Sequence, residues 1–277
     1  MIIAVASDKG SPGASTLSLL MGICWPGDRV VVELDACGAD LPYRVAGTDG
    51  QPLAASPTIT TLAVDSRPGA AGQPLLRYAQ VAGCGVPLVV GETSAARFTR
   101  IASHLPAVVD VLAAAPETVI VDLGRLSSTS PVLSCARSAA VTVLVSHADT
   151  SSLGHLRERV EDLAAELGGS HRLRTPLAVV VRADRRDAHA AEVRVSKLLA
   201  SVGSPTVVLG VVPDDAPGVA ALHTGAVSRR VSRSSLFTAA REVVARLRAT
   251  WPELTETTAP VNAPEPQTIT SIAGVRQ

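Results

Sequence analysis

Short apolar runs rich in β-branched residues recur along the chain and alternate with longer Ala- and Leu-rich stretches that have helical spacing. Most of these runs are apolar at consecutive positions, which is typical of central parallel strands buried on both faces. The predicted strands are residues 2–6, 29–34, 87–90, 118–122, 140–146, 177–181 and 206–211. The predicted helices are residues 15–22, 93–112, 152–167, 190–202 and 235–251. This alternation predicts an α/β fold with a doubly wound, mostly parallel sheet of about seven or eight strands.

Two segments depart from this rhythm. Residues 47–85 are rich in Gly, Pro, Ser and Thr, and we expect an irregular insertion with short helices at 60–65 and near 74–82. Residues 255–277 are polar, rich in Pro and Thr, and contain no aromatic residue. Such a segment cannot bury enough apolar surface to offset its ordering entropy, so we expect a disordered tail. The chain is therefore interpreted as one domain over residues 1–254 followed by this tail.

Composition narrows the class of protein. Hydrophobic residues make up 47% of the chain and aromatic residues only 2%, so the core must consist of small aliphatic side chains. The formal net charge is zero, which predicts no bulk attraction to nucleic acid or membrane. The cysteines are scattered without a CxxC pair, so reduced thiols are expected rather than disulfides or a zinc site. The chain has no signal-peptide pattern and no long apolar span, which predicts a cytoplasmic protein without direct membrane insertion.

The first predicted strand runs into a glycine-containing loop, residues 7–16, which is followed by a helix. A P-loop requires this strand, turn and helix N-terminus, because backbone N–H groups and the helix dipole together form an anion cradle. Gly10 and Gly13 are the positions where the backbone can adopt positive φ or approach a phosphate closely. The alternative is a plain tight turn in which Ser15 or Ser11 caps the helix.

The loop resembles the deviant Walker A motif of the MinD/ParA family, K-G-G-x-G-K-[ST]-T. Lys9 matches the signature lysine of the family, Gly10 and Gly13 match two of its glycines, and Ser15 and Thr16 match the hydroxyl pair. The resemblance implies an ATP-binding loop that consists of Lys9, Gly10, Ser11, Pro12, Gly13, Ala14, Ser15 and Thr16.

Two positions of the loop depart from the family pattern. Ser11 replaces a glycine, which is a mild change, whereas Ala14 replaces the P-loop lysine itself. That lysine bridges the β- and γ-phosphates in the family, and a methyl group cannot. Its loss should weaken nucleotide binding and transition-state stabilisation, judging from the size of comparable electrostatic contacts.

Acidic residues follow two of the predicted strands. Glu33 and Asp35 end the second strand, and Asp122 ends a run that resembles Walker B. The resemblance implies that Asp35 orients the attacking water and that Ser15, Asp35 and Asp122 hold Mg²⁺, with Asp35 and Lys9 as the catalytic residues. The alternative for Asp35 is a polar strand end that begins a turn. Arg125 could either supply positive charge near a phosphate or pair with Asp122.

Two later segments resemble the part of the family that surrounds the nucleotide base. Arg182 stands at the end of a strand where the family carries the Asn that contacts adenine, which is a second departure bearing on ATP. Residues 209–215, which include Pro213 and Asp214, match the late G-x-I-P-x-D segment, which is followed by an A-x-x-x-G stretch at residues 221–225. The resemblance covers about residues 1–250 in the family order.

The family consists of ATP-driven spatial organisers that dimerise with the signature lysine of each subunit in the other's site. The resemblance therefore implies a homodimer with an unknown protein partner, acting in partitioning, septum placement or pilus assembly of the TadZ/CpaE kind. Because Ala14 lacks the phosphate-binding cation, we expect nucleotide binding that is weak or lost. One alternative is a slow ATPase in which another cation compensates. The other is an interaction scaffold that needs no nucleotide.

Non-specific DNA binding is a further possibility, because the region after the last predicted strand is locally basic. The alternative is an ordinary solvated helix face balanced by Glu242 and Glu253, which we favour. The arginines concerned are Arg229, Arg230, Arg233, Arg241, Arg246 and Arg248.

Overall fold

The computed structural model describes residues 1–10, 12–66, 72–167, 175–229 and 231–252. Ser11, Arg230 and the predicted tail at 255–277 lie outside the described residues. Among the described residues, none of the helices combines the length and the apolar content needed to cross a bilayer.

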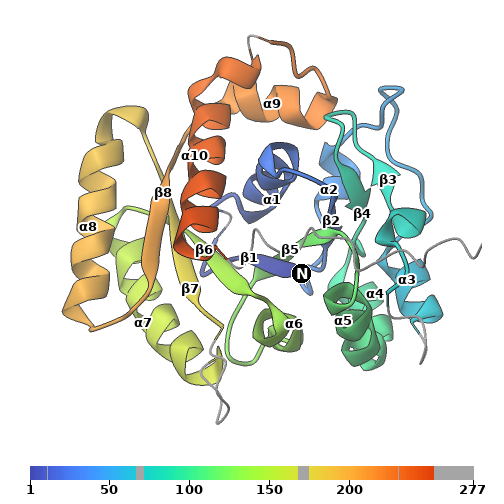
Figure 1. The fold of residues 1–277 in the computed structure, drawn as a ribbon, viewed down its shortest axis with the longest axis horizontal. Helices are drawn as coiled ribbons and strands as arrows, with labels where there is room; N and C mark the ends of the chain where they lie inside the picture. The colour runs from blue at the N-terminus through green and yellow to red at the C-terminus, as the bar shows by residue number, and fades with distance from the viewer. Residues whose placement is uncertain (11, 67–71, 168–174, 230, 253–277) are drawn as a thin grey trace, which may run out of the picture.

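The centre of the molecule is an eight-stranded sheet in the order β3-β4-β2-β5-β1-β6-β7-β8 (Figure 1). All neighbouring pairs are parallel except β3 and β4. The strands are β1 (Ile2–Ser7), β2 (Arg29–Glu33), β3 (Gln80–Val81), β4 (Pro87–Val89), β5 (Thr118–Arg125), β6 (Val141–His147), β7 (Leu177–Ala183) and β8 (Val207–Pro213). The predicted fold class is confirmed, and every predicted strand is present.

Helices cover both faces of this sheet. They are α1 (Ala14–Cys24), α2 (Leu41–Arg44), α3 (Ile59–Asp65), α4 (Ala95–Ile101), α5 (Leu105–Ala113), α6 (Leu133–Ser138), α7 (Thr150–Leu167), α8 (Ala188–Ser201), α9 (Ala216–Thr224) and α10 (Ser235–Thr250). The described residues also form the short 3₁₀ turns η1 (Leu75–Tyr78), η2 (Ala102–His104), η3 (Arg185–Asp187) and η4 (Val231–Arg233).

Two helix predictions are wrong in detail. The single helix predicted over 93–112 is two helices, α4 and α5, separated by a 3₁₀ turn. Pro106 lies in the first turn of α5, where it has no N–H to donate and its ring crowds the preceding turn. The helix predicted near 74–82 is a 3₁₀ turn followed by the edge strand β3. Pairing with β4 holds this segment extended, and the Gln80 side chain bonds the backbone of Ala54 and Pro57.

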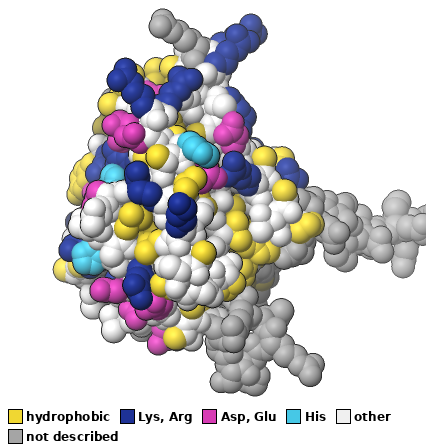
Figure 2. Space-filling model, turned by 90° about the vertical axis from the view of Figure 1, so that its left-hand side faces the viewer, with side chains coloured by type: hydrophobic (Ala, Val, Ile, Leu, Met, Phe, Trp, Pro, Cys, Tyr) yellow, Lys and Arg dark blue, Asp and Glu magenta, His cyan; other side chains and the backbone are white. Residues whose placement is uncertain are grey.

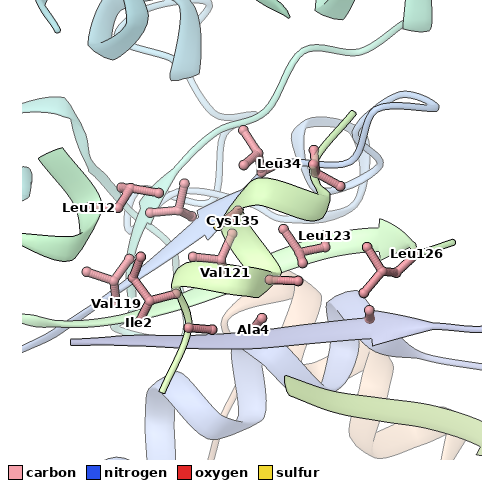
Figure 3. Packing of buried hydrophobic residues seen from close by; sticks show 14 of the residues in the cluster. Ile2, Ala4, Leu34, Leu112, Val119, Val121, Leu123, Leu126 and Cys135 are labelled. Carbon is pink, nitrogen blue, oxygen red and sulfur yellow. The ribbon is translucent and has the colours of Figure 1, made fainter. Parts of the chain in front are cut away.

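Strand β1 shows how the sheet separates two hydrophobic cores. Every residue of β1 is buried. Ile2, Ala4 and Ala6 pack in the core under α3 to α8, whereas Ile3 and Val5 pack in the core under α1, α2, α9 and α10. Figure 3 shows part of the first core, where Val, Leu and Ile side chains interlock around Cys135. Burial on both faces explains why the strands are continuously apolar in the sequence.

The parallel arrangement determines where a functional site can form. The carboxyl ends of β1, β2, β5, β6, β7 and β8 meet at one edge of the sheet. In the sheet, β1 lies between β5 and β6, so the strands beside it are not its neighbours in the sequence. Ligands of open α/β sheets bind in the crevice outside the carboxyl ends of the strands at such a point.

Candidate functional site

The loop between β1 and α1 forms an open backbone cradle. Gly10 has φ of 73° and Gly13 has φ of 105°, and a Cβ built at either position would meet nothing within 4 Å. Gly13 is the N-cap of α1, it makes no side-chain cap, and the first turn of the helix has no acidic residue. Among the described residues, the first N–H groups of α1 therefore have no side-chain cap and can receive an anion. The alternative in which Ser15 caps this helix is wrong, because Gly13 is the N-cap.

Ala14 contributes packing to this loop and no charge. Its side chain is 6% exposed and lies in the core under α1, and the Ser18 hydroxyl donates to its carbonyl at 3.0 Å. A phosphate held by this cradle would therefore meet N–H groups without the neighbouring ammonium that a P-loop lysine supplies.

Charged side chains from α7 and β5 hold the start of the loop. Asp8 is buried and pairs with Arg159 at 2.9 Å, and the Asp8 carbonyl accepts a hydrogen bond from Arg125 Nε at 3.1 Å. Lys9 Nζ lies 2.9 Å from His155 Nε2 on α7. Arg125 thus contacts the loop backbone, and it makes no ion pair with Asp122 among the described residues.

Asp122 is the deepest charged group of the site. It is fully buried, its Oδ1 accepts the Gly124 N–H at 3.0 Å, and its Oδ2 has no partner among the described residues. Burial raises the pKa of Asp122 to about 6, while the Ser15 hydroxyl and the Gly124 N–H lower it. The predicted metal residues Ser15 and Asp122 are therefore brought together by α1 and β5. A buried carboxylate oxygen without a partner is what a cation with oxygen ligands would satisfy.

Asp35 and Glu33 have different roles at the end of β2. Asp35 lies beside Gly124, accepts the Cys37 N–H at 2.7 Å, and has its pKa raised mainly by burial.

The carboxylate of Glu33 is buried, with 1% of the residue exposed. Its carboxylate accepts backbone N–H groups from Asp40 and Leu41, both at 2.9 Å, and from Gly91 at 3.2 Å. Burial, and then Asp122, raise the pKa of Glu33 to about 8. Glu33 thus ties the loop after β2 to the end of β4.

A cavity of about 460 Å³ opens beside the cradle. It brings together the loop and the two later segments that the sequence singled out, since its lining includes Pro12, Gly13, Thr16, Arg182, Pro213 and Asp214. Arg182 Nε and Asp214 Oδ1 form an ion pair at this cavity. Its volume lies in the range of small-molecule sites.

Among the polar residues that line this cavity, sequence reasoning missed Arg44 on α2 and His223 on α9. The His223 Nε2 atom is buried without a partner among the described residues, and burial lowers the pKa of His223, with Arg44 adding to the effect. The sequence could have indicated His223 through its position in the A-x-x-x-G stretch at residues 221–225. Arg44 had no signal, because α2 is four residues long and its position depends on tertiary contacts.

The arginines considered for DNA binding are partly used inside the fold. Arg246 pairs with Glu192 of α8 at 2.6 Å, and Arg241 donates to the Ser232 carbonyl at 2.9 Å. Figure 2 shows Lys and Arg side chains interspersed with Asp and Glu on the side of the molecule that it faces. These observations favour a solvated, internally paired helix face.

No protein-family model matches the sequence, and a search of curated proteins gives no match either. Solved structures do match. A ParA family ATPase from Chlorobium tepidum aligns with a TM-score of 0.67 and 14% identity, over 89% of this chain and 98% of that one. The septum site-determining protein MinD of Pyrococcus horikoshii, complexed with Mg-ADP, aligns with a TM-score of 0.63 and 16% identity, over 94% of this chain and 99% of that one. The MinC:MinD complex of Aquifex aeolicus aligns with a TM-score of 0.59 and 13% identity, over 90% of this chain and 95% of that one. This chain has the α/β P-loop NTPase fold of the ParA and MinD ATPases.

Proposed function

We propose that this chain is a ParA/MinD-like positioning protein of the cytoplasm whose nucleotide site is weakened at Ala14. One observation carries the proposal: the uncapped cradle at Gly13 and the base-side residues Arg182 and Asp214 border a single cavity. The site thus retains the backbone half of a P-loop, while the cation that grips the β- and γ-phosphates is absent. Partitioning, septum placement and pilus assembly are the processes that this proposal covers.

The donor groups present fit Mg²⁺ together with nucleotide phosphates. Asp122 offers a buried carboxylate oxygen that has no hydrogen-bond partner within the described residues, and the Ser15 hydroxyl and Asp35 lie near this carboxylate. No group of three or more His, Cys, Asp or Glu in the described ranges forms a metal cluster. Mg²⁺ needs no such cluster, because one or two carboxylates plus substrate phosphates commonly hold it. When bound, the ion would neutralise phosphate charge and Asp122 would hold it in place, with Asp35 positioned to orient water.

We propose that the chain acts as a homodimer that binds a protein partner. One of the similar structures is a complex of MinC with MinD, which supports the proposal of a protein partner. In this chain Lys9 contacts His155 of its own α7, so a dimer that uses Lys9 across the interface must first break that contact. Arg229 and Arg233 are exposed and are the residues that non-specific DNA binding would use.

Calorimetric titration with Mg-ATP and Mg-GTP tests the nucleotide half of the proposal. The natural chain is compared with Ala14→Lys and with Ala14→Met, a control of similar length without charge. We expect weak binding by the natural chain and by Ala14→Met, and binding about tenfold tighter or more by Ala14→Lys, as one charge-assisted contact allows. Circular dichroism verifies that both variants fold around the buried position 14.

The same titrations, together with an assay of phosphate release, separate the alternatives. If the natural chain binds at micromolar concentration and releases phosphate, it is a slow ATPase. If no form of the chain binds either nucleotide, the nucleotide proposal is wrong and the chain is an interaction scaffold.

A further inference from the structure

The base side of the cavity carries an ion pair where the resembling family carries an amide. Arg182 stands at the end of β7 and Asp214 directly follows β8, and these neighbouring parallel strands align Arg182 with Val212. Both side chains line the cavity that Gly13 and Thr16 border from the phosphate side. Their position is therefore that of a group that contacts the base of a nucleotide whose phosphates lie in the cradle.

The ion pair leaves hydrogen-bonding capacity free on both partners. Arg182 uses Nε to bond Asp214 Oδ1. In the part of the chain that the structure describes, the four Nη hydrogens of Arg182 and the Oδ2 atom of Asp214 make no other hydrogen bond. The side chains are 39% and 45% exposed, so both can be reached from the cavity. A ligand thus meets fixed donors and an acceptor side by side.

A third group points to a polar ligand in the same cavity. His223 Nε2 is buried and has no partner among the described residues, although His223 lines the cavity. A buried ring nitrogen without a partner costs free energy unless a ligand or water satisfies it. The cavity lining also includes Arg44 and Asp215, and apolar side chains such as Leu17, Val180 and Leu236, which suit the faces of a planar ring.

The exposed chemistry complements guanine better than adenine. Guanine presents O6 and N7 as adjacent acceptors, which an arginine contacts in a bidentate manner, whereas Asn and Gln make the matching contact with adenine N6 and N7. Guanine also presents the N1–H and the 2-amino group as adjacent donors, which suit a carboxylate acceptor. Adenine has an acceptor at N1, which would face the Asp214 carboxylate. Arg182 at the position of the family's Asn, with Asp214 paired to it, therefore complements guanine better than adenine.

We propose that Arg182 and Asp214 make this cavity selective for guanine nucleotides over adenine nucleotides. This inference rests on the proposed nucleotide-binding function and adds the identity of the base. Because the cradle lacks the charge of a P-loop lysine, contacts with the base carry a larger share of the affinity than they would in a complete P-loop.

The test measures the affinity of the full chain for fluorescent GDP and ADP, each labelled on the ribose, in the presence of Mg²⁺. We expect GDP to bind about 5- to 150-fold tighter than ADP, the range that one bidentate base contact supports. Arg182→Asn should remove or reverse this preference, and Asp214→Asn should weaken GDP alone. Arg186→Ala is the matched control, because Arg186 is exposed on η3, which follows β7, and does not line the cavity.

Each outcome decides the inference. Equal or tighter binding of ADP by the natural chain, or an unchanged preference in Arg182→Asn, overturns guanine selectivity and leaves the nucleotide-binding proposal standing. Absence of binding by both nucleotides, also in Ala14→Lys, overturns both proposals together. Preference for GDP that depends on Arg182 and Asp214 but not on Arg186 supports the inference.

Discussion

The carboxylate of Asp35 occupies the space directly above Gly124. A Cβ added at position 124 would lie 2.0 Å from Asp35 Cγ and 2.1 Å from Oδ2, so only glycine can stand there without displacing Asp35. Gly124 also has φ of 60°, and its N–H donates to Asp122. The end of β5 therefore positions both acids of the candidate metal site.

Gly124→Ala should destabilise the protein more than backbone strain alone explains. A left-handed residue with a side chain costs about 1–2 kcal/mol, and the clash with Asp35 should add about 1–3 kcal/mol as in other overpacked sites. Gly203→Ala is the control, because Gly203 has φ of 62° and nothing within 4 Å of its added Cβ. Chemical denaturation measures both variants. Equal losses of unfolding free energy would show that Asp35 is not held against Gly124.

The ion pair of Asp8 and Arg159 should be important for stability, because removing either side chain leaves the other charge buried without a partner of opposite charge. Arg159→Met removes the partner of a carboxylate that is 5% exposed, and we expect a loss of about 3 kcal/mol. Asp8→Asn combined with Arg159→Met should recover part of that loss. Arg157→Ala, which breaks the exposed contact with Glu161 on the same helix, should change stability by less than about 1 kcal/mol. Urea unfolding of the double-mutant cycle tests this, and additive losses would contradict it.

The first turn of α7 should be sensitive to acid through Asp149. Hydrogen bonds from the Ser151 and Ser152 hydroxyls hold the pKa of Asp149 well below its usual value of 3.8. A lowered carboxyl pKa in the folded state stabilises that state above the unfolded pKa, and the contribution is lost as the pH falls through the lower folded pKa. Asp149→Ala should therefore cost about 0.5–1 kcal/mol at pH 7, as for other caps, and less below about pH 4.

The control for this prediction is Asp149→Asn, which keeps an acceptor for the N–H groups of Ser151 and Ser152 without a titratable charge. Its stability relative to the natural chain should fall less at pH 7 than that of Asp149→Ala. A pH-independent difference between Asp149→Ala and the natural chain from pH 7 down to pH 3 would contradict the assignment.

Release of Lys9 from His155 should favour the proposed dimer. The contact between these side chains is exposed, and a hydrogen bond of this kind contributes about 0.5–1.5 kcal/mol. His155→Ala should then increase nucleotide-dependent association by about two- to tenfold, whereas Lys9→Ala should abolish it. Sedimentation velocity with Mg-nucleotide measures association, with His189→Ala as an exposed control on α8. An unchanged dimer fraction in Lys9→Ala would show that Lys9 does not act across the interface.

The sequence by itself determined the strands, their parallel sheet and the loop after β1. These features depend on local patterns: a strand buried on both faces must be apolar throughout, and a cradle needs Gly10 and Gly13 where φ is positive. Arg182 and Asp214 were indicated differently, by the resemblance of their segments to the MinD/ParA family and not by a local pattern.

Tertiary structure alone decided which groups those residues meet. Lys9 and His155 are separated by 146 positions and Asp8 and Arg159 by 151, so no local pattern could pair them. Pairing with β4 made β3 a strand where helical spacing favoured a helix. The bond between Arg125 and the Asp8 carbonyl, and the place of Asp35 above Gly124, likewise follow from how β5 packs beside β1 and β2. Packing of the whole sheet sets such distances, because each depends on elements that are remote in the chain and adjacent only after folding.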